Sequence, residues 1–287
     1  MNWILPIVLL IVIGFLLDRE IYFYEGVHLG PRVQAWLYDR WSKKYDEGKR
    51  ASQLRDSEML ALPLLELLKD ISEPLILDFA TGTGRLSFAL LSEPDFKGHI
   101  IALDLSLGML EQATAKLHQF ILRSEQGSKV ASPGARVELL RHVALPLPFP
   151  NEAFDVVCCL EVLELFPDMD VPLAELTRVL RPGGILLTSR GTEESGRKAR
   201  VKSKPVFTSI LEKYGMLNIQ ITTWWKLFDR VLAQKTGMTN QAGAKTLSAV
   251  MKCGACGQTQ WRQEAGALKC QNCGRALSIT KEGIVLN

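Results

Sequence analysis

The chain has 287 residues, 47% of them hydrophobic, and a formal net charge of +3 at pH 7. This length allows one buried core of roughly 150 to 200 residues with smaller attachments. The small net charge excludes a strongly basic, polyanion-directed protein but leaves nucleic acid open as a partner.

The first predicted element is an uncharged apolar run from Trp3 to Leu17, which is followed by Tyr22–Tyr24. A helix of this length measures about 22 Å, short of a hydrocarbon core of about 30 Å, so its flanks would have to reach the interfaces. No basic residue precedes the run and no small-x-small site follows it, which favours an uncleaved anchor over a signal peptide. A buried or surface helix is the remaining alternative.

We therefore expect residues 1–24 to form a single-pass transmembrane anchor. Basic residues downstream of it predict that the body of the protein is cytoplasmic. These residues are Arg19, Arg32, Arg40, Lys43 and Lys44.

Residues 25–72 are expected to be helical. Pro31 suits the first turn of a helix, and apolar side chains then recur at helical spacing up to Trp41. A second helical pattern covers 53–69. These helices either cover a ligand or simply pack against a sheet.

The segment Leu75-Ile-Leu-Asp-Phe-Ala-Thr-Gly-Thr-Gly-Arg85 carries the strongest functional signal. It predicts a buried strand that ends at a carboxylate, Asp78, and enters a loop in which Gly82 and Gly84 let a ligand approach the backbone. Such a loop is typical of a cofactor site.

A second apolar run, His99 to Asp104, helps to choose the cofactor. Asp104 lies twenty positions after Gly84, as in a dinucleotide-binding unit, but the third glycine of that fingerprint would fall at Ser87. Asp78 would also repel a pyrophosphate. A cofactor with an adenosine ribose, a sulfonium and an ammonium avoids this repulsion, and S-adenosylmethionine (SAM) has these groups.

Two more stretches, Leu147-Pro-Phe-Pro-Asn-Glu-Ala-Phe-Asp-Val-Val157 and Arg178-Val-Leu-Arg-Pro-Gly-Gly184, complete the pattern. With them, the segment from about Tyr38 to Lys235 resembles a class I SAM-dependent methyltransferase of the small-molecule type that includes the quinone-biosynthesis enzymes. The resemblance implies an α/β fold, with a doubly wound, mostly parallel seven-stranded sheet of order 3-2-1-4-5-7-6 and strand 7 antiparallel.

The patterns place helices and strands in alternation along this segment, and a closing hairpin follows. Helices are predicted at 84–92, 107–123, 172–180 and 205–214. Strands are predicted at 75–79, 99–104, 136–141, 154–160, 185–189, 217–223 and 227–234. Pro182-Gly-Gly184 is expected to end the third of these helices sharply.

By similarity, Asp78 and the loop up to Gly84 would line the methionine part of SAM, and Asp104 would bind both ribose hydroxyls. Leu105 and Met109 would flank the adenine. The cofactor-binding residues implied by the resemblance are Asp78, Phe79, Ala80, Thr81, Gly82, Gly84, Asp104, Leu105, Met109, Val143 and Ala144.

The chain departs from the family pattern at two of these positions. Ala80 replaces the first glycine of the loop, so we expect its φ to be negative or close to it. Val143 aligns with an acidic residue that often binds the adenine amino group. Adenine recognition is then expected to rest on backbone groups of Val143 and Ala144, or on the neighbouring His142.

No catalytic residue is assigned from the sequence. Glu161 and His142 are weak candidates for a base that accepts a proton from a hydroxyl acceptor. Glu164 has a helix cap or an ion pair as an equal alternative, and Cys158 and Cys159 are expected to be core residues.

The loop after the fifth predicted strand, 190–204, is strongly basic and is expected to border the substrate entrance. Its cations suit an anionic headgroup, a membrane surface or a phosphate backbone, and a solvated loop is the alternative. The side chains concerned are Arg197, Lys198, Arg200, Lys202 and Lys204.

Four cysteines near the end of the sequence form two Cys-x-x-Cys-Gly knuckles: Cys253, Cys256, Cys270 and Cys273. Two such knuckles can supply four thiolates to one structural Zn²⁺. Iron in the same cage is an alternative, and disulfides do not suit a reducing cytosol. We expect a small zinc ribbon with a hairpin between its knuckles and with metal binding as its main source of folding energy.

The predicted organisation is a membrane anchor (1–24), a helical lid (25–72), a SAM-binding domain (73–236), a linker (237–250) and a zinc ribbon (251–287). The predicted function is methyl transfer from SAM to a small, lipid-soluble or membrane-associated acceptor. One alternative is a nucleic acid or protein methyltransferase whose ribbon recognises the target. The other is a non-catalytic, membrane-tethered scaffold.

Overall fold

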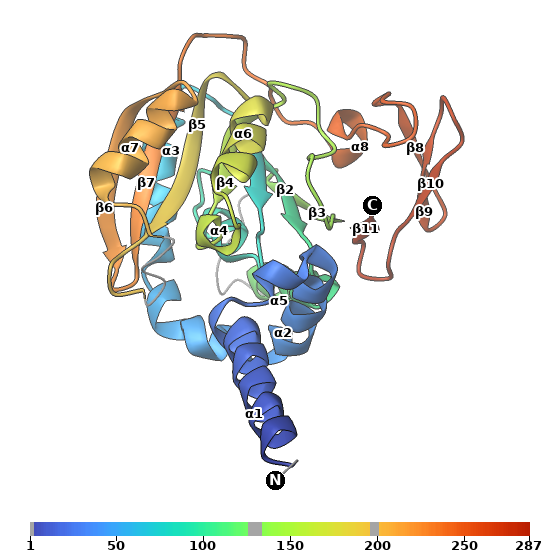
Figure 1. The fold of residues 1–287 in the computed structure, drawn as a ribbon. Coiled ribbons are helices and arrows are strands. Elements are labelled where there is room, and N and C mark those ends of the chain that lie inside the picture. The colour runs from blue at the N-terminus through green and yellow to red at the C-terminus, as the bar shows by residue number, and fades with distance from the viewer. Residues whose placement is uncertain (1–2, 126–133, 196–200) are drawn as a thin grey trace.

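The computed structural model describes residues 3–125, 134–195 and 201–287. At its centre is one sheet with the strand order β11-β3-β2-β1-β4-β5-β7-β6 (Figure 1). Its strands are β1 (Leu75–Phe79), β2 (His99–Asp104), β3 (Arg136–Arg141), β4 (Phe154–Cys159), β5 (Leu180–Gly191), β6 (Met216–Trp225), β7 (Phe228–Lys235) and β11 (Val285–Leu286).

The predicted order of the first seven strands is confirmed, and β7 runs antiparallel to both of its neighbours. The predicted number of strands is wrong, because β11 pairs in parallel with β3 and adds an eighth. This short strand comes from the segment that the sequence places in the ribbon.

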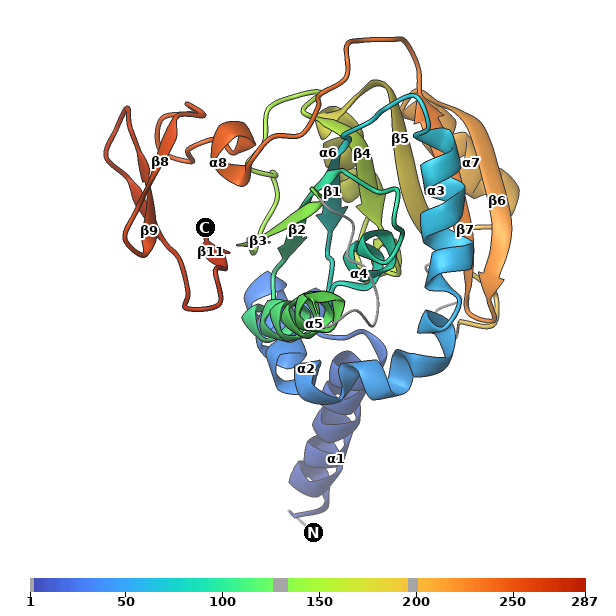
Figure 2. The ribbon, with the colours of Figure 1, turned by 180° about the vertical axis from the view of Figure 1, so that it is seen from behind.

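Helices cover both faces of the sheet, which explains why β1, β2 and β4 are buried along their whole length. One face carries α6 (Asp170–Val179) and α7 (Lys204–Lys213), which lie in front in Figure 1. The opposite face carries α3 (Leu62–Leu67), α4 (Arg85–Leu91) and α5 (Leu107–Glu125), in front in Figure 2.

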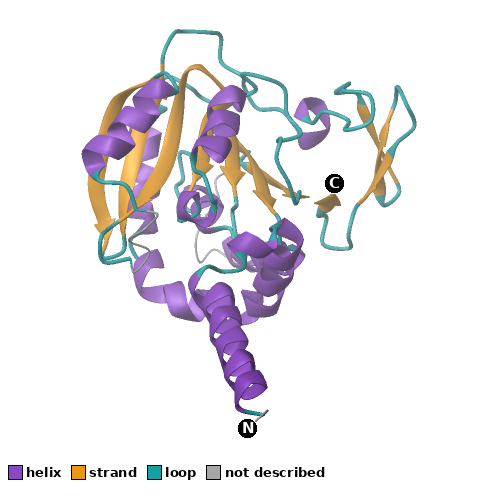
Figure 3. Cartoon of the chain, viewed as in Figure 1, coloured by secondary structure: helices purple, strands orange, loops and turns teal. Residues whose placement is uncertain are grey.

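The N-terminal apolar run forms α1 (Ile4–Asp18), which projects from the body of the molecule in Figure 3. None of its side chains is buried. Across residues 3–125, 134–195 and 201–287, no helix combines the length and the apolarity that crossing a membrane requires. The structure therefore does not support the predicted transmembrane span.

Short turns connect α1 to the long helix α2 (Pro31–Gln53), which begins at Pro31 as predicted. The turns are η1 (Arg19–Phe23) and η2 (Val27–Leu29). After α2, a π-helical turn, η3 (Ser57–Ala61), leads into α3. The predicted second helix is thus divided between η3 and α3.

The start of β5 differs from the prediction. Helix α6 ends at Val179, and the extended strand has already begun at Leu180, so Pro182-Gly-Gly184 lies within β5 and does not end the helix. Opposite this stretch, the pairing register with β4 shifts. Gly184 is needed there because a Cβ atom would lie 2.8 Å from the Asp155 carbonyl oxygen.

The predicted linker is tied to the core through Asp155, which is fully buried. Its carboxylate pairs with Arg181 at 2.6 Å and accepts hydrogen bonds from the backbone N–H of Ala242 and Gly243. The linker ends in a short helix, α8 (Leu247–Val250).

The predicted ribbon hairpin is present. It consists of β8 (Trp261–Glu264) and β9 (Ala267–Cys270), and β10 (Ala276–Ser278) completes a three-stranded antiparallel sheet. Trp261, Leu268 and Leu277 are buried in the same cluster as residues of the main sheet. The ribbon is therefore packed on the core, with more buried apolar surface than the sequence suggested.

The basic loop of 190–204 falls partly outside the described residues, including Arg197, Lys198 and Arg200. At its start, Arg190 is buried and pairs with Asp229 at 2.7 Å. This arginine is a structural residue.

Candidate functional site

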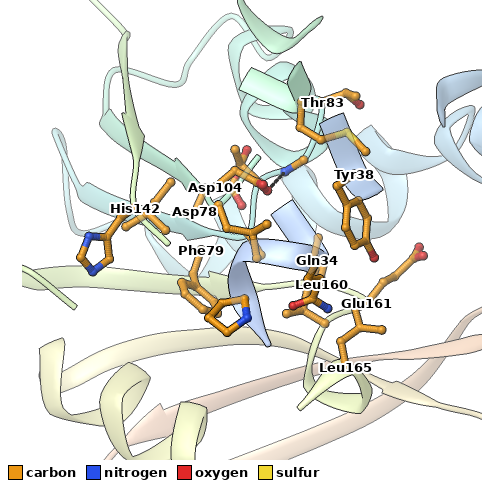
Figure 4. Close-up of a pocket in the computed structure, with 18 of the residues that line it drawn as sticks. Gln34, Tyr38, Asp78, Phe79, Thr83, Asp104, His142, Leu160, Glu161 and Leu165 are labelled. Atoms are coloured by element: carbon orange, nitrogen blue, oxygen red, sulfur yellow. Dashed lines mark hydrogen bonds between the residues drawn. The ribbon is translucent and has the colours of Figure 1, made fainter. Parts of the chain in front are cut away.

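A cavity of about 450 Å³ lies at the carboxyl ends of β1, β2 and β4, where open α/β sheets bind their ligands. Helix α2 and η2, from the N-terminal part of the chain, cover the cavity, and the stretch 142–145 forms another wall. Figure 4 shows His142 on one side of this cavity and Glu161 on the other, with Asp78 and Asp104 between them.

The loop after β1 forms the floor of the cavity. Asp78 is buried, and its carboxylate accepts hydrogen bonds from the hydroxyls of Thr81 (2.6 Å) and Ser87 (3.0 Å). A Cβ on Gly82 would meet no atom within 4 Å, so the backbone here faces open space that a ligand can occupy.

The expectation for Ala80 is wrong. Its φ is +54°, in the left-handed region that an L-residue other than glycine seldom adopts. The chain thus keeps the backbone shape of the glycine-rich loop without the glycine. Strain of this kind typically persists where function requires the shape.

Asp104, at the end of β2, connects the floor to the next loop. One carboxylate oxygen accepts the N–H of Gly82 and the other accepts the N–H of Ser106, both at 2.8 Å. Burial raises the pKa of Asp104 to about 6, and burial likewise raises the pKa of Asp78 to about 6. A cationic ligand beside these two carboxyl groups would stabilise their charged forms and lower their pKa values.

All the predicted cofactor-binding residues line the cavity except Gly84. Gly84 instead starts α4 with a φ of +80°, and a Cβ there would lie 3.3 Å from the Cβ of Ala113 on α5. Its role is to let the loop turn against α5. The open backbone at Gly82 and the two buried carboxyls fit the ribose, sulfonium and ammonium of SAM.

His142 is held at the edge of the cavity. Its Nε2 lies 3.2 Å from the Pro146 carbonyl oxygen, to which it donates, and its Nδ1 lies 3.1 Å from the side-chain nitrogen of Asn287. These contacts define a neutral ring with both nitrogens bonded, and burial lowers its pKa. His142 is thus a wall residue, on the far side of the cavity from Glu161 (Figure 4).

Glu161 follows β4 and has a φ of +60°. Its carboxylate pairs with Lys49 of α2 and with Arg85 of α4, the latter at 2.7 Å. Arg85 also pairs with Asp56 at 2.6 Å and lies 4.3 Å from the ring centre of Trp224. The structure brings these charged groups together at one end of the cavity.

Apolar side chains surround this charged end. Phe79 and Phe166 stack with ring centres 6.4 Å apart, and the lining also includes Leu160, Val162 and Leu165. An apolar acceptor would therefore find a matching wall beside a carboxylate and an ammonium group.

Sequence reasoning missed Lys49, Arg85 and Asp56. Tyr38, Tyr45 and Lys49 line the cavity from one face of α2. Spacings of seven and four residues place these three side chains on one side of a helix. This spacing is a signal from which Lys49 could have been predicted. Burial raises the pKa of Tyr45, so its hydroxyl keeps its proton.

Helix α2 is fastened over the cofactor loops by two aspartates. Asp39 accepts a hydrogen bond from the Ser106 hydroxyl at 2.6 Å and one from the N–H of Gly108 at 2.8 Å. Asp46 accepts one from the Thr83 hydroxyl at 2.6 Å. The predicted lid thus contacts both loops that should hold the cofactor.

The remaining candidates near β4 have structural roles. Glu164 is buried and accepts the backbone N–H of Gly191 at 2.5 Å. Cys158 and Cys159 are fully buried in β4, as expected, and burial raises the pKa of each thiol well above its ordinary value.

The four knuckle cysteines form a cluster in which every Sγ lies within 4.8 Å of the others. The distance is 3.6 Å from Cys253 to Cys273 and from Cys256 to Cys270, too long for disulfides. Four sulfurs at about 2.3 Å from one Zn²⁺ would lie about 3.8 Å apart in a tetrahedron. The cluster therefore has the dimensions of a closed zinc site.

The electrostatics of the cluster also favour a cation. The N–H of Gln258 and the side chain of Asn272 lower the pKa of Cys256 to about 6. The N–H of Arg275 lowers the pKa of Cys273, but burial and the neighbouring sulfurs raise it to about 12. A divalent ion would let all four thiols ionise together.

The chain is similar to known proteins. The family of methyltransferase domains matches residues 77–188. A demethylmenaquinone methyltransferase of Lactococcus lactis is 33% identical over 153 residues, or 53% of this chain and 56% of that protein. Another, of Lactiplantibacillus plantarum, is 30% identical over 185 residues, or 63% of this chain and 72% of that protein.

A solved SAM-dependent methyltransferase from Aquifex aeolicus shares the fold. Its TM-score is 0.50 at 20% identity, and the match covers 68% of this chain and 97% of that one. The family segment contains the end of β1, the loop after it, Asp104 and Glu161, which form a large part of the cavity. The chain thus belongs to the SAM-dependent methyltransferases.

Proposed function

We propose that this enzyme methylates a small, lipid-soluble aromatic acceptor of the quinol or phenol class. The observation that carries the proposal is the cavity itself, because one half has carboxylates and open backbone for SAM and the other half is apolar. The apolar half ends at Glu161 and Lys49. Relatives named demethylmenaquinone methyltransferase support a quinone-like acceptor.

In this proposal SAM lies across the tips of β1 and β2. Asp104 binds the ribose, Asp78 faces the charged methionine part, and Leu105 and Met109 enclose the adenine with the 142–145 wall. SAM supplies a methyl group that is already activated by the sulfonium. Alignment of acceptor and methyl by the protein then provides most of the rate.

Glu161 and Lys49 act on the acceptor. Transfer forms a bond from the methyl carbon to the acceptor and breaks the carbon–sulfur bond, leaving S-adenosylhomocysteine. Glu161 takes the proton that the acceptor loses, and the Lys49 ammonium stabilises the resulting anionic oxygen. The Phe79 and Phe166 rings exclude water from this end.

We also propose that α1 attaches the enzyme to the apolar layer of a membrane, with the catalytic body in the cytoplasm. The helix exposes apolar side chains on all sides, which suits lipid better than a single protein partner. Val27, Pro31 and Gln34, shortly after α1, line the cavity. The attachment site is therefore close in sequence to residues that line the cavity.

For the ribbon we propose a structural Zn²⁺ held by its four thiolates. Its distances and electrostatics support zinc, and mass spectrometry of metals in the purified protein measures it directly. One zinc per chain is expected. One iron per chain in its place would show that the cluster holds the alternative ion.

The decisive experiment measures transfer of labelled methyl from SAM by the full chain. Liposomes carrying a reduced demethylquinone are compared with RNA and protein fractions. We expect incorporation into the quinol. Asp104→Ala should abolish it, whereas Asp95→Ala, at an exposed aspartate that does not line the cavity, should not. Incorporation into RNA or protein alone would overturn the acceptor class.

A further inference from the structure

The ribbon contacts one wall of the cofactor cavity from behind. Residues 142–145 line the cavity, and the turn that follows them reaches Pro148. Two backbone hydrogen bonds flank this stretch: the N–H of Asn287 donates to the Arg141 carbonyl at 3.1 Å, and that of Lys252 to the Pro148 carbonyl at 2.7 Å. Both donors belong to the segment that carries the cysteine cluster.

The contact of Asn287 is connected to the cysteine cluster by paired strands. Strand β11 pairs with β3, and Val285 forms a bridge to Ile279 just after β10. Strand β10 pairs with β9, whose last residue is Cys270. Ile284 is fully buried, which fixes β11 against the core.

The contact of Lys252 is close to the cysteine cluster in sequence. Lys252 is adjacent to Cys253, and the Met251 carbonyl accepts a hydrogen bond from the Trp261 indole at 2.8 Å. Trp261 begins β8, which pairs with β9. Both ends of the 142–148 stretch are therefore attached to segments that converge on the four thiols.

One side chain carries the contact to the cavity lining itself. The side-chain amide nitrogen of Asn287 lies 3.1 Å from Nδ1 of His142. The backbone N–H of His142 donates to the Asp104 backbone carbonyl at 2.9 Å. Asn287 thereby orients a residue that separates the ribbon from the space assigned to adenine.

We propose that the metal-loaded ribbon is a positioning element of the cofactor site: it holds the 142–148 wall in the shape that recognises adenine. Metal loading then controls SAM affinity. The inference rests on the proposed placement of adenine beside Val143 and Ala144 and on the proposed metal at the cluster. Asn287 is its positioning residue and acts through His142.

The test uses calorimetry with the full zinc-loaded chain and two ligands, S-adenosylhomocysteine and S-inosylhomocysteine. The second has a carbonyl where adenine has its amino group, so the ratio of the two Kd values reports recognition of the base. A partly unfolded sample lowers the binding stoichiometry but leaves this ratio unchanged.

Asn287→Ala should weaken S-adenosylhomocysteine binding roughly three- to tenfold, as expected for one lost hydrogen bond, and should bring the ratio closer to one. Removing zinc with a chelator should have the same effect, reversed by added Zn²⁺. Gln263→Ala, at an exposed position of β8, should change neither quantity.

The outcomes separate the two proposals. Unchanged affinity and an unchanged ratio in both Asn287→Ala and zinc-depleted protein would overturn the role of the ribbon and leave the function standing. Failure of the zinc-loaded wild type to bind S-adenosylhomocysteine would overturn the proposed function and this inference with it.

Discussion

The two ends of the cavity are built by different kinds of contact. At the end assigned to adenine, backbone hydrogen bonds flank and support the wall, as in His142 to Asp104 and Lys252 to Pro148. At the acceptor end, ion pairs of Glu161 with Lys49 and Arg85 connect helices that are far apart in sequence. Backbone hydrogen bonds carry no net charge and depend little on ionic strength, whereas ion pairs weaken as salt rises to the extent that solvent reaches them.

This difference suggests how the enzyme combines a constant cofactor with the entry of an acceptor. The cofactor end can keep one shape through the catalytic cycle. Helix α2 contacts both ends, because its Asp39 and Asp46 bind the cofactor loops and its Lys49 pairs with Glu161. The comparison can be tested from either end.

The largest effect is expected at the acceptor end. Glu161→Gln removes the proposed base and should lower kcat by about 10²- to 10⁴-fold. Glu66→Gln is the matched control, since Glu66 is exposed on α3 and lies outside the cavity lining. The SAM affinity of Glu161→Gln, measured by calorimetry, should differ from that of the wild type by less than about threefold. A normal kcat in Glu161→Gln would remove the base from this end.

The second effect concerns the ribbon. Cys270→Ser removes one thiolate and should abolish stoichiometric zinc, with a loss of about 3 kcal/mol or more in the free energy of unfolding. A loss of this size corresponds to a fall in Tm of about 6 to 12 °C. Cys158→Ser in β4 tests the specificity of the metal result, because it should leave the zinc content at one per chain. Full zinc in Cys270→Ser would contradict the assigned ligand set.

The third effect is a pH dependence at the cofactor end. Asp78 and Asp104 have pKa values raised to about 6 in the unliganded protein, and cationic SAM favours their charged forms. SAM affinity should therefore fall as pH drops below about 6, by up to about tenfold for each carboxyl near pH 5. Without SAM the sign reverses: these two groups stabilise the fold below their ordinary pKa of 3.8, and that contribution disappears as pH rises through 6.

Calorimetry between pH 5 and 7.5 measures this dependence. Burial also raises the pKa of Asp56 to about 6, but Asp56 lies at the acceptor end. Asp56→Asn should therefore keep the pH dependence and Asp78→Asn should reduce it. A constant Kd over this range would contradict the assignment of both carboxyls to the cofactor.

The smallest effect on the folded body is expected from α1. Deleting residues 1–18 should change Tm by less than about 1 °C and leave SAM affinity unchanged, because α1 buries none of its side chains. Flotation with liposomes should show at least a tenfold loss of membrane binding. Leu54→Asp, which alters an exposed leucine after α2, is the control and should still float. A large fall in Tm on deletion would show that α1 packs on the body.

Much of the fold was predictable because its signals are local. The buried strands are continuous apolar runs, and β1, β2 and β3 have the predicted bounds. Strand β11 was missed because two residues carry no periodic pattern and its pairing is decided by tertiary contacts. The early start of β5 has a similar cause, since its backbone is extended by pairing with β4 in spite of Pro182 and two glycines.

The same division applies to the site. Residues within one motif, such as Asp78 and Gly82, could be predicted to lie together in one cavity because their spacing is fixed by the loop. Lys49 and Glu161 are 112 positions apart, so no local pattern could bring them together. The positive φ of Ala80 was also missed, because sequence predicts the common conformation of a residue and not the strain that its neighbours impose.

The pairing of β11 with β3 has one more consequence, which concerns solubility. Without β11, the N–H and C=O groups at the end of β3 would be exposed along an open sheet edge, and such edges recruit strands from other molecules. The ribbon therefore caps the sheet. If the proposed metal were lost and β11 detached with it, the folded enzyme would expose this end of β3 and tend to self-associate through it.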